Sequence, residues 1–547
     1  MEFEMKKFSV IFLALMLALF FAACGKTTGG TPCDPNKECC NGEGVCVDDD
    51  DDIDDDDDIQ KPEPPCEGEE CCDPATECCD GEGKCDCDPA VECCDGEGKC
   101  EDVCESEICK IQQGEVLEGT EVTVKECVVT AILHNQDNET HENTAIQGIY
   151  ISDIIPEAQP YTGIYVFIKG NETVDKYKVG DKLEVKGTYK EYYENSQIEA
   201  AEINKLGTAD LPKPAVVAPE SVATPFELVG EEYSPTANHG ADAEKYEGVL
   251  VKVDNVKITN PNLGHGSFEV AGKLSVTKDL YYYNGSRSKG VEFDSITGIL
   301  VYSYDAFQLA PRSIDDFEVK IINTTISPIQ KEEVATGSTV KISESVVTAI
   351  AYKSEKQSDD TYKNVAIKGL YISEIIPQAE PYTGIYVFIK STADVDAYAV
   401  GDKLEITGTV EEYYESTQIS LADTANINKL GTADLPAPAE VDPSKISTPY
   451  AQNGEEWEPT TSHGADAEKY ESVLVKVNNV EVTNNNLGHG AFEVTGNLAI
   501  SKDLYYYDGS RSIGTKFNSI SGILTYSYSA FQLAPRSGED FVTAAGD

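Results

Sequence analysis

Tyrosine clusters are the part of this sequence whose residue types and spacing offer the most chemistry. Tyrosine rings can stack on a base or a sugar, and tyrosines two positions apart lie on one face of a strand. A pair of adjacent tyrosines followed by a glutamine occurs twice and provides Tyr192, Tyr193, Gln197, Tyr413, Tyr414 and Gln418. A run of three tyrosines followed by an arginine also occurs twice and provides Tyr281, Tyr283, Arg287, Tyr505, Tyr507 and Arg511. We treat all of them as candidate ligand-binding residues, with packing inside and between domains as the alternative.

No arrangement of residues typical of an enzyme occurs after residue 110 of the sequence. The sequence HExxH, the cysteine and histidine spacing of zinc sites and a glycine-rich phosphate loop are all absent there. The six histidines are His134, His141, His239, His265, His463 and His489. We therefore expect no catalytic residue, no metal site and no cofactor, with Ca²⁺ on the acidic segments as an open alternative. The sequence favours a protein that is not an enzyme.

The first 23 residues have the pattern of an export signal. Two lysines precede an apolar run from Phe8 to Ala23, which is shorter than the roughly 18 to 20 residues of a membrane-spanning helix. The run ends in two alanines and Cys24, and it resembles a bacterial lipoprotein signal. The resemblance implies cleavage before Cys24 and acylation of that residue. We expect an exported protein anchored by lipid to the cell envelope, at the outer membrane, on its periplasmic or its outer face.

Residues 24–110 have the composition of an acidic, cysteine-rich tether. A unit of the form C-x5-C-C-x5-C occurs three times, with turn-forming pairs at fixed places. An even number of cysteines in an exported chain indicates disulfides, whose pairing stays open, and a thiolate metal cluster is the alternative. Ten aspartates between Asp48 and Asp58 favour a solvated spacer over a calcium site. The disulfide candidates are Cys33, Cys39, Cys40, Cys46, Cys72, Cys78, Cys79, Cys85, Cys87, Cys93, Cys94 and Cys100.

The net charge of −56 at pH 7 is divided unevenly along the 547 residues. The stretch 31–110 has 30 acidic and five basic residues, and the stretch 111–547 has 66 acidic and 34 basic residues. Affinity for duplex DNA comes largely from cations that neutralise phosphates. We therefore do not expect double-stranded DNA as a partner.

From about residue 111 onward the sequence consists of two copies of one module of roughly 210 residues. The sequence GIYVFIK begins at Gly163 and again at Gly384, and FQLAPRS begins at Phe307 and again at Phe531. Short runs of β-branched and aromatic residues alternate with Gly, Asn, Asp and Pro breaks, which predicts an all-β fold. A Pro-rich link divides each copy. The predicted units are 111–211, 241–320, 329–435 and 465–545.

The first half of each copy resembles the OB-fold domains that accompany bacterial extracellular nucleases. The resemblance lies in GIYVF followed by VGDKLEVKGTYKEYYENSQI from Val179 and VGDKLEITGTVEEYYESTQI from Val400. The second half has a related ending, from Ile296 and from Ile520. The resemblance implies five-stranded Greek-key barrels, two in each copy, and a groove bordered by the tyrosine pairs. The sequence reaches Asp547 without the nuclease domain that often follows in that family.

These observations predict a lipid-anchored protein that presents tandem OB-like barrels to a ligand. OB folds bind oligonucleotides and oligosaccharides, and the acidity places a glycan or a protein ahead of single-stranded nucleic acid. The alternatives are an accessory that holds nucleic acid for a separate extracellular nuclease, and a purely structural surface protein. Arg312 and Arg536 are expected to close barrels rather than contact ligand. Cys127, which Ser345 replaces in the second copy, is expected to be a free buried thiol.

Overall fold

The computed structural model describes residues 92–94, 100–102, 105–136, 143–357, 362–454 and 456–544. The chain divides into two compact units, Met1–Val103 and Cys104–Asp547. In the first unit the described residues form an antiparallel pair of strands, β1 (Glu92–Cys94) and β2 (Cys100–Asp102). The predicted signal segment, the lipidation residue Cys24 and the aspartate run all lie outside the described residues. The same holds for the disulfide candidates from Cys33 to Cys87, and of Cys93, Cys94 and Cys100 only the backbone is described.

The prediction of an all-β protein is confirmed in the second unit. Its longest described helix, α1 (Glu107–Gln112), has six residues. The other short helices are α2 (Pro219–Val222), α3 (Ile326–Gln330), α4 (Pro443–Ile446) and the 3₁₀ turns η1 (Glu244–Tyr246), η2 (Ala271–Lys273), η3 (Ile314–Asp316), η4 (Glu468–Tyr470) and η5 (Gly538–Asp540). No helix among the described residues is both long and apolar enough to cross a membrane.

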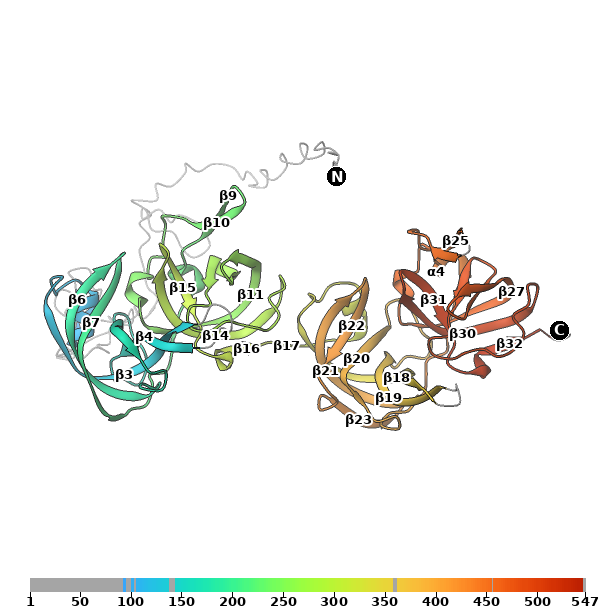
Figure 1. Ribbon diagram of the computed structural model, residues 1–547, viewed down its shortest axis with the longest axis horizontal. Helices are drawn as coiled ribbons and strands as arrows, with labels where there is room; N and C mark the ends of the chain where they lie inside the picture. Colours follow the sequence, from blue (N-terminus) through green and yellow to red (C-terminus); the bar gives the residue numbers. More distant parts are fainter. Residues whose placement is uncertain are drawn as a thin grey trace, which may run out of the picture. The chain divides into compact units, whose positions relative to one another are not determined.

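Five strands of the first half of copy one close into a barrel in the order β3-β4-β5-β7-β6. They are β3 (Glu121–Gln136), β4 (Asn143–Ser152), β5 (Gly163–Glu172), β6 (Asp181–Tyr192) and β7 (Asn195–Thr208) (Figure 1). The strands β5 and β7 are parallel, and the other pairs are antiparallel. Buried and half-buried residues alternate along most of β6, because successive side chains of a strand point to opposite faces.

The second half of copy one repeats this strand order. The ring is β11-β12-β13-β15-β14, closed by pairing of β14 with β11, and β13 is parallel to β15. Its strands are β11 (Leu250–Gly264), β12 (Ser267–Val270), β13 (Leu274–Val276), β14 (Glu292–Ser303) and β15 (Ala306–Ala310). Two additional strands extend the sheet, β8 (Ala215–Val216) next to β11 and β16 (Phe317–Val319) next to β14.

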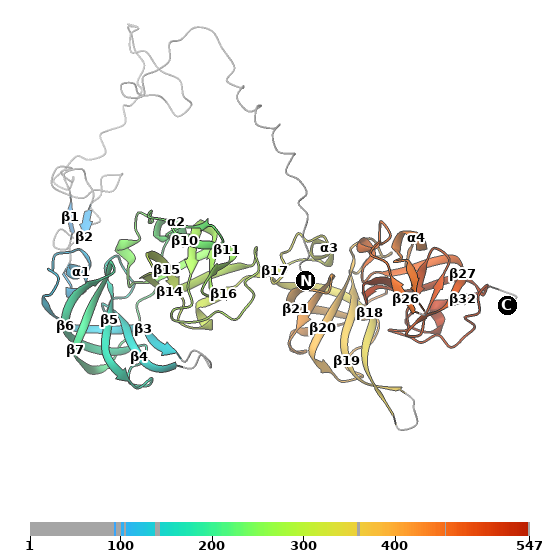
Figure 2. The same cartoon turned by 45° about the horizontal axis from the view of Figure 1, so that its top comes forward.

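Copy two contains the same two rings (Figure 2). The third ring is formed by β18 (Thr339–Lys356), β19 (Tyr362–Ser373), β20 (Gly384–Ala393), β22 (Ser416–Leu421) and β21 (Asp402–Tyr413), with β17 (Ile321–Asn323) and β23 (Ile427–Thr432) at its edges. The fourth is formed by β27 (Leu474–Gly488), β28 (Ala491–Val494), β29 (Leu498–Ile500), β31 (Ala530–Ala534) and β30 (Lys516–Ser527), with β24 (Ala439–Glu440) and β32 (Phe541–Thr543). Each ring surrounds its own apolar core.

The stretch 212–240, predicted as a Pro-rich link, is more structured than its composition indicates. It contains β8, α2 and a two-stranded hairpin, β9 (Phe226–Val229) with β10 (Glu232–Pro235). Copy two has the matching hairpin, β25 (Tyr450–Asn453) with β26 (Glu456–Pro459). Because β8 pairs with β11, this stretch belongs to the second ring of the copy rather than to a spacer.

Helix α1 lies across the predicted boundary at residue 110. Its residues Ile108 and Ile111 are part of the core of the first ring, and Cys109 is buried and disulfide-bonded. Cys127 is a free, fully buried cysteine, as expected from the sequence. Burial raises the pKa of its thiol to about 12, so the thiol is protonated and unreactive at neutral pH.

The two rings of a copy are in direct contact. Gly163, the first residue of β5, lies so close to Gly248 that a β-carbon at this position would overlap the Gly248 carbonyl oxygen. Gln112 Nε2 on α1 donates hydrogen bonds to the carbonyl oxygens of Gly163 and Glu247, at 2.7 and 3.0 Å. Copy two has the same contacts through Gly384. The glycine of the GIYVFIK sequence is therefore required by a close approach of two backbones.

Candidate functional site

In each of the four rings a two-residue turn joins the fourth strand to the fifth, and a tyrosine is its first residue. Tyr193 and Glu194 form this turn between β6 and β7, with φ of 50° and 59°. Positive φ at both central residues is the geometry of a type I′ turn, for which Asn-Gly is favoured. The other turns have the same signs of φ and are Tyr304–Asp305, Tyr414–Glu415 and Tyr528–Ser529.

The four turn tyrosines point into solvent. Tyr193, Tyr304, Tyr414 and Tyr528 are 78%, 85%, 80% and 81% exposed. A bulky residue with positive φ carries a conformational cost of roughly 1–2 kcal/mol, and an exposed ring recovers little of it by packing. Tyrosine at these positions therefore does not serve the folding of the turn, and its ring is available to a ligand.

A second tyrosine lies beside the turn in the first ring of each copy. Tyr192 and Tyr193 have ring centres 4.7 Å apart in an edge-to-face arrangement, and Tyr413 and Tyr414 repeat it at the same distance. All four rings are exposed. The sequence predicted this pairing, and the structure places it at the end of the barrel. Two mutually perpendicular rings form a surface on which a flat ligand can pack.

The turn of the first ring in each copy is fixed by the second ring. In copy one the Tyr302 hydroxyl donates to Glu194 Oε2 at 2.8 Å, and Asn195 Nδ2 donates to Glu247 Oε1 at 2.8 Å. In copy two the Tyr526 hydroxyl donates to Glu415 Oε2 at 2.6 Å, and the Ser416 hydroxyl donates to Glu471 Oε1. The exposed tyrosines therefore lie on turns whose flanking residues are held in place.

The buried glutamate at this junction has a raised pKa in both copies. Burial raises the pKa of Glu471 to about 8, although hydrogen bonds from Ser416 and Thr417 act in the opposite direction. Burial likewise raises the pKa of Glu247 well above its ordinary value. Nearby carboxylates add to both shifts and are Glu191, Glu244, Glu412 and Glu468. The tyrosine pairs thus lie next to a group of glutamates rather than next to cations.

The predicted glutamines do not reach the surface. Gln197 lies on β7 opposite Tyr165 of β5 and is buried, as is Gln418 at the same position of copy two. Gln418 Nε2 donates to Glu411 Oε2 at 3.4 Å. Because Gln197 and Gln418 are buried beside Tyr165 and Tyr386, on the face of the strand opposite to the barrel core, their side chains are not available to a ligand in this structure.

The prediction that Tyr281 and Tyr283 form a platform on one face of a strand is wrong. Both residues lie in the loop between β13 and β14, so the two-residue periodicity of a strand does not apply. Tyr283 is 6% exposed and stacks on Phe317 with ring centres 4.2 Å apart. Tyr507 of copy two stacks in the same way on Phe541, with Tyr505 half-buried nearby. These tyrosines belong to the cores of the second and fourth rings.

The middle tyrosine of each run, which sequence reasoning passed over, is the exposed one. Arg287 lies 4.9 Å from the centre of the Tyr282 ring, donates to the Tyr282 hydroxyl at 2.6 Å and donates to the Gly266 carbonyl oxygen at 3.0 Å. Arg511 and Tyr506 have the same arrangement. A loop that ends in Asn-Gly or Asp-Gly after the three tyrosines was the available signal against a strand.

His239, His463 and His489 contact neighbouring aromatic or hydroxyl side chains. His239 Nδ1 is 2.7 Å from the Thr224 hydroxyl, and its ring meets the edges of aromatic residues, as does His463. His489 lies in the turn between β27 and β28 and stacks on Tyr528 with ring centres 6.1 Å apart. No group of three or more histidine, cysteine, aspartate or glutamate side chains in the described ranges is placed to hold a metal ion. His141 lies outside those ranges.

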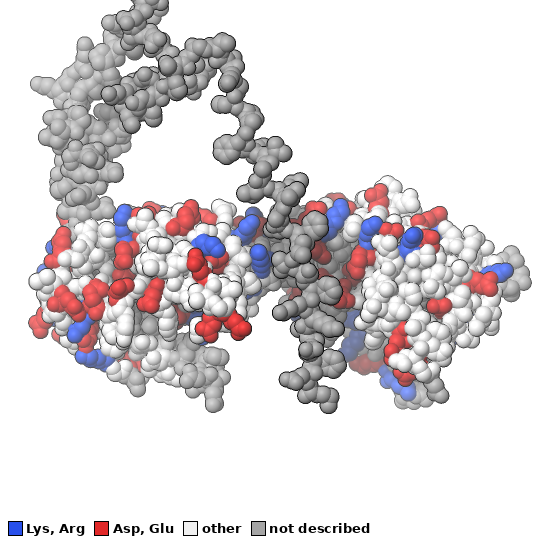
Figure 3. All heavy atoms as spheres, turned by 90° about the horizontal axis from the view of Figure 1, so that it is seen from above, with Lys and Arg blue, Asp and Glu red and all other residues white. Residues whose placement is uncertain are grey.

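Arg312 and Arg536, which were expected to close barrels, instead connect the two rings of each copy. Arg312 Nη2 is 2.7 Å from Asp316 Oδ1, and its Nη1 donates to the Thr130 carbonyl oxygen of the first ring at 3.2 Å. Arg536 pairs with Asp540 in the same way. Figure 3 shows acidic side chains spread among fewer basic ones over the face that is visible there.

No family model matches this chain, and no curated protein matches it. Among the solved structures, a chain described as "drosophila Unr CSD456" matches with 10% sequence identity. The alignment covers 58% of this chain and 99% of that chain, with a TM-score of 0.13.

Proposed function

We propose that this protein is a non-enzymatic, lipid-anchored envelope protein whose four OB-type barrels bind a carbohydrate through their turn tyrosines. The observation that carries the proposal is the exposed tyrosine at a left-handed turn position in every ring. Four repetitions of a locally unfavourable and solvent-exposed aromatic residue are accounted for by binding, because the turn geometry disfavours tyrosine and the ring contacts of Tyr193 with Tyr192 and of Tyr528 with His489 leave most of each ring exposed.

The strand order supports the OB assignment. In all four rings the first strand pairs with the second and the fourth, and the third strand runs parallel to the fifth. The OB fold is a five-stranded Greek-key barrel whose loops between strands one and two and between strands four and five border the ligand. The turn tyrosines occupy the second of these loops in every ring.

The charge around the tyrosine pairs favours a sugar over a nucleic acid. Glu194 and Glu415 follow the turn tyrosines directly, and the buried Glu247 and Glu471 lie behind them. Phosphate binding needs cations that release counterions from the backbone, and carboxylates oppose it. A carboxylate can instead accept hydrogen bonds from sugar hydroxyls while an aromatic ring packs on the sugar face.

The membrane attachment in this proposal comes from the sequence. The apolar run that ends at Cys24 resembles a lipoprotein signal, and the acidic tether that follows would separate the barrels from the lipid surface. Two lipid chains give a stable anchor without a spanning helix.

The test uses the full chain, a panel of immobilised glycans and single-stranded DNA. Tyr193 and Tyr414 are replaced together by asparagine, which type I′ turns accept well, so that the change removes the ring and favours the fold. The control is Tyr362→Asn, because Tyr362 is an exposed tyrosine on β19 away from these turns. We expect the unmodified chain to bind a glycan. The double variant should bind it with at least tenfold lower affinity, and the control should bind it with unchanged affinity.

Three other outcomes would contradict the proposal. Salt-sensitive binding of DNA that the double variant weakens would assign the barrels to nucleic acid, as an accessory of a separate nuclease. Binding of neither probe by the unmodified chain would leave a structural surface protein. Glycan binding of unchanged affinity and stoichiometry in the double variant would show that Tyr193 and Tyr414 do not bind the glycan.

A further inference from the structure

The fourth ring places an aromatic residue of a second loop beside its turn tyrosine. Tyr528 is in the turn between β30 and β31, and His489 is in the turn between β27 and β28. Their ring planes are parallel to within 5°, their ring centres are 6.1 Å apart, and both side chains are exposed. These turns are the two loops that border the ligand in an OB fold. Each of them therefore presents one ring at the same place on the surface.

A lysine and an arginine lie against the turn that contains His489. Gly490 has a φ of 82°, and a β-carbon there would lie 2.9 Å from Lys502 Cδ and 3.7 Å from Lys502 Cε. Because the ammonium nitrogen is bonded to Cε, it lies beside this turn. Arg511 Nη1 donates to the Gly490 carbonyl oxygen at 3.2 Å, and its Nη2 donates to the Tyr506 hydroxyl at 2.6 Å. The two cations are thus held next to the aromatic residues.

These two cations lack a carboxylate partner. Arg312 and Arg536 pair with aspartates, whereas neither Arg511 nor Lys502 forms an ion pair within the described part of the chain. Asp503, which follows Lys502, instead accepts a hydrogen bond from a serine hydroxyl at 3.3 Å. The chain has 98 acidic and 42 basic residues, so two unpaired cations at one turn are an exception. Two cations and one carboxylate leave this surface positive, which favours an anionic group on the ligand.

The residue after the turn tyrosine also distinguishes the fourth ring. A carboxylate follows the tyrosine in the first, second and third rings, where the residues are Glu194, Asp305 and Glu415. In the fourth ring Ser529 follows Tyr528. Of the four turn tyrosines, Tyr528 is therefore the one that has no acidic neighbour in its turn.

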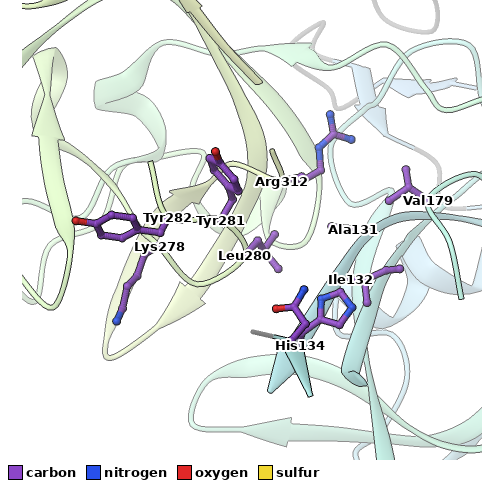
Figure 4. Close-up of a pocket in the computed structure, with 10 residues that line it drawn as sticks. Ala131, Ile132, His134, Val179, Lys278, Leu280, Tyr281, Tyr282 and Arg312 are labelled. Carbon is purple, nitrogen blue, oxygen red and sulfur yellow. The ribbon is translucent and has the colours of Figure 1, made fainter. Parts of the chain in front are cut away.

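The second ring has the same loop and serves as an internal comparison. A β-carbon on Gly266 would lie 2.9 Å from Lys278 Cδ, and Arg287 Nη1 donates to the Gly266 carbonyl oxygen at 3.0 Å. Figure 4 shows Lys278 and Tyr282 projecting from this loop away from the first ring. The difference is Asp305, which adds a carboxylate beside the turn tyrosine. The arrangement of cations therefore recurs in both copies, and its acidic neighbour is absent from the turn in copy two.

We infer that the fourth ring binds an acidic sugar, whose face packs on Tyr528 and His489 and whose carboxylate or sulfate lies beside Lys502 and Arg511. The inference rests on the proposed function, because it assumes that the turn tyrosines bind sugars. Hydrogen bonds between such cations and an anionic group are roughly twice as strong as those between neutral groups. A nucleic acid is a poorer match, because two cations cannot follow a chain of phosphates over an otherwise acidic protein.

The test compares acidic sugars with matched neutral ones on the full chain. Oligogalacturonate is paired with its methyl ester and dextran sulfate with dextran, so that the two pairs separate a carboxylate from a sulfate. Lys502→Gln removes an exposed cation, and Lys445→Gln is the control for net charge because Lys445 is exposed on α4, outside these loops. We expect the unmodified chain to bind one acidic sugar at least tenfold more tightly than its neutral partner. Lys502→Gln should reduce this preference about fivefold, and Lys445→Gln should leave it unchanged.

A second variant tests the aromatic part of the site. Asparagine adopts positive φ readily, so His489→Asn removes the ring and keeps the turn. We expect it to weaken binding of the preferred acidic sugar about fivefold, with an unchanged melting temperature. A preference for the acidic sugar that is unchanged in both Lys502→Gln and His489→Asn would overturn the inference.

The remaining outcomes separate this inference from the proposed function. Equal binding of acidic and neutral sugars, together with loss of binding when Tyr193 and Tyr414 are replaced, would overturn the inference alone. Binding of no sugar by the unmodified chain would overturn both. Binding of single-stranded DNA but of no acidic sugar, weakened by Lys502→Gln, would assign the cations to phosphate and would also overturn the inference.

Discussion

At each turn position, the residue that best suits the turn geometry differs from the tyrosine that we propose binds the ligand. Asparagine at the first position of a type I′ turn adopts positive φ at low cost, whereas tyrosine is strained there. Tyr193 and Tyr414 are exposed, so their replacement removes little packing. We expect Tyr193→Asn and Tyr414→Asn each to raise the free energy of unfolding by about 0.5–1 kcal/mol, as measured by urea denaturation.

The same change outside a left-handed position serves as the comparison. Tyr362→Asn replaces an exposed strand residue and should lower stability slightly, because tyrosine is favoured in strands. Loss of stability in Tyr193→Asn would mean that the ring makes packing contacts, and its availability to a ligand would then be in doubt.

The buried glutamates predict how stability depends on pH. Glu471 keeps its proton in the folded protein up to about pH 8, whereas its ordinary pKa is 4.5. Between these values the unfolded chain releases a proton that the folded chain retains. Stability is therefore highest at the acidic end of this window and falls as pH rises toward 8. Thermal unfolding should show a smaller loss of melting temperature between pH 5 and pH 8.5 in Glu471→Gln than in the unmodified protein.

A control separates this effect from the general acidity of the chain. Glu118 is exposed, and Glu118→Gln changes the net charge by the same amount without affecting the junction between rings. Glu247→Gln should behave like Glu471→Gln, because burial also raises the pKa of Glu247. Parallel pH profiles for the Glu471→Gln variant and the unmodified protein would show that Glu471 ionises normally.

At the residue scale the sequence pointed to half of the turn tyrosines. Tyr193 and Tyr414 follow another tyrosine and were recognised as a cluster, whereas Tyr304 and Tyr528 lie in runs that alternate like a strand. The handedness of a turn depends on how two strands twist against each other, so neither the positive φ nor the exposure could be seen in the alternation. The burial of Gln197 could not be seen either, because it depends on the opposite strand β5.

At the scale of elements the contact between rings depends on a close backbone approach. A methyl group at Gly163 would collide with the backbone of Gly248, which cannot move without shifting the start of the second ring. We expect Gly163→Ala to destabilise copy one by about 1–3 kcal/mol, and Gly384→Ala to do the same for copy two. Calorimetry should show an earlier transition for the affected copy only.

The opposite outcome is that the added methyl group leaves the melting temperature of the copy unchanged. If Gly163→Ala and Gly384→Ala melted at the same temperature as the unmodified protein, the close backbone approach between the rings would not contribute to the stability of a copy.

The alternation of apolar and polar residues along the strands made the all-β class predictable from the sequence. The structure of the segments that connect the strands was harder to predict. Residues 181–190 alternate buried and half-buried as their sequence indicates. The segment from Tyr281 to Tyr283 was predicted as a strand but is a loop. Three aromatic residues in a row satisfy a strand pattern even where no neighbouring strand pairs with them. The stretch 212–240 was predicted as a link because its prolines suppress strand signals, although Ala215 and Val216 pair with β11.

At the scale of the whole molecule the charge and the N-terminal segment predict where the barrels are held. The chain should fractionate with membranes, and Cys24→Ser should release it, because the acylated residue would be lost. Cys33→Ser is the control and should stay with the membrane fraction. Release of both variants, or of neither, would contradict an anchor at Cys24.

The central claim is that the barrels bind a carbohydrate through four turn tyrosines. The most direct test is a calorimetric titration of the full chain with the glycan that it retains best, compared with a variant in which Tyr193, Tyr304, Tyr414 and Tyr528 are all asparagine. We predict that this variant melts at or above the temperature of the unmodified protein and that its glycan binding is lost. Binding of unchanged affinity and stoichiometry in the folded variant would contradict the claim.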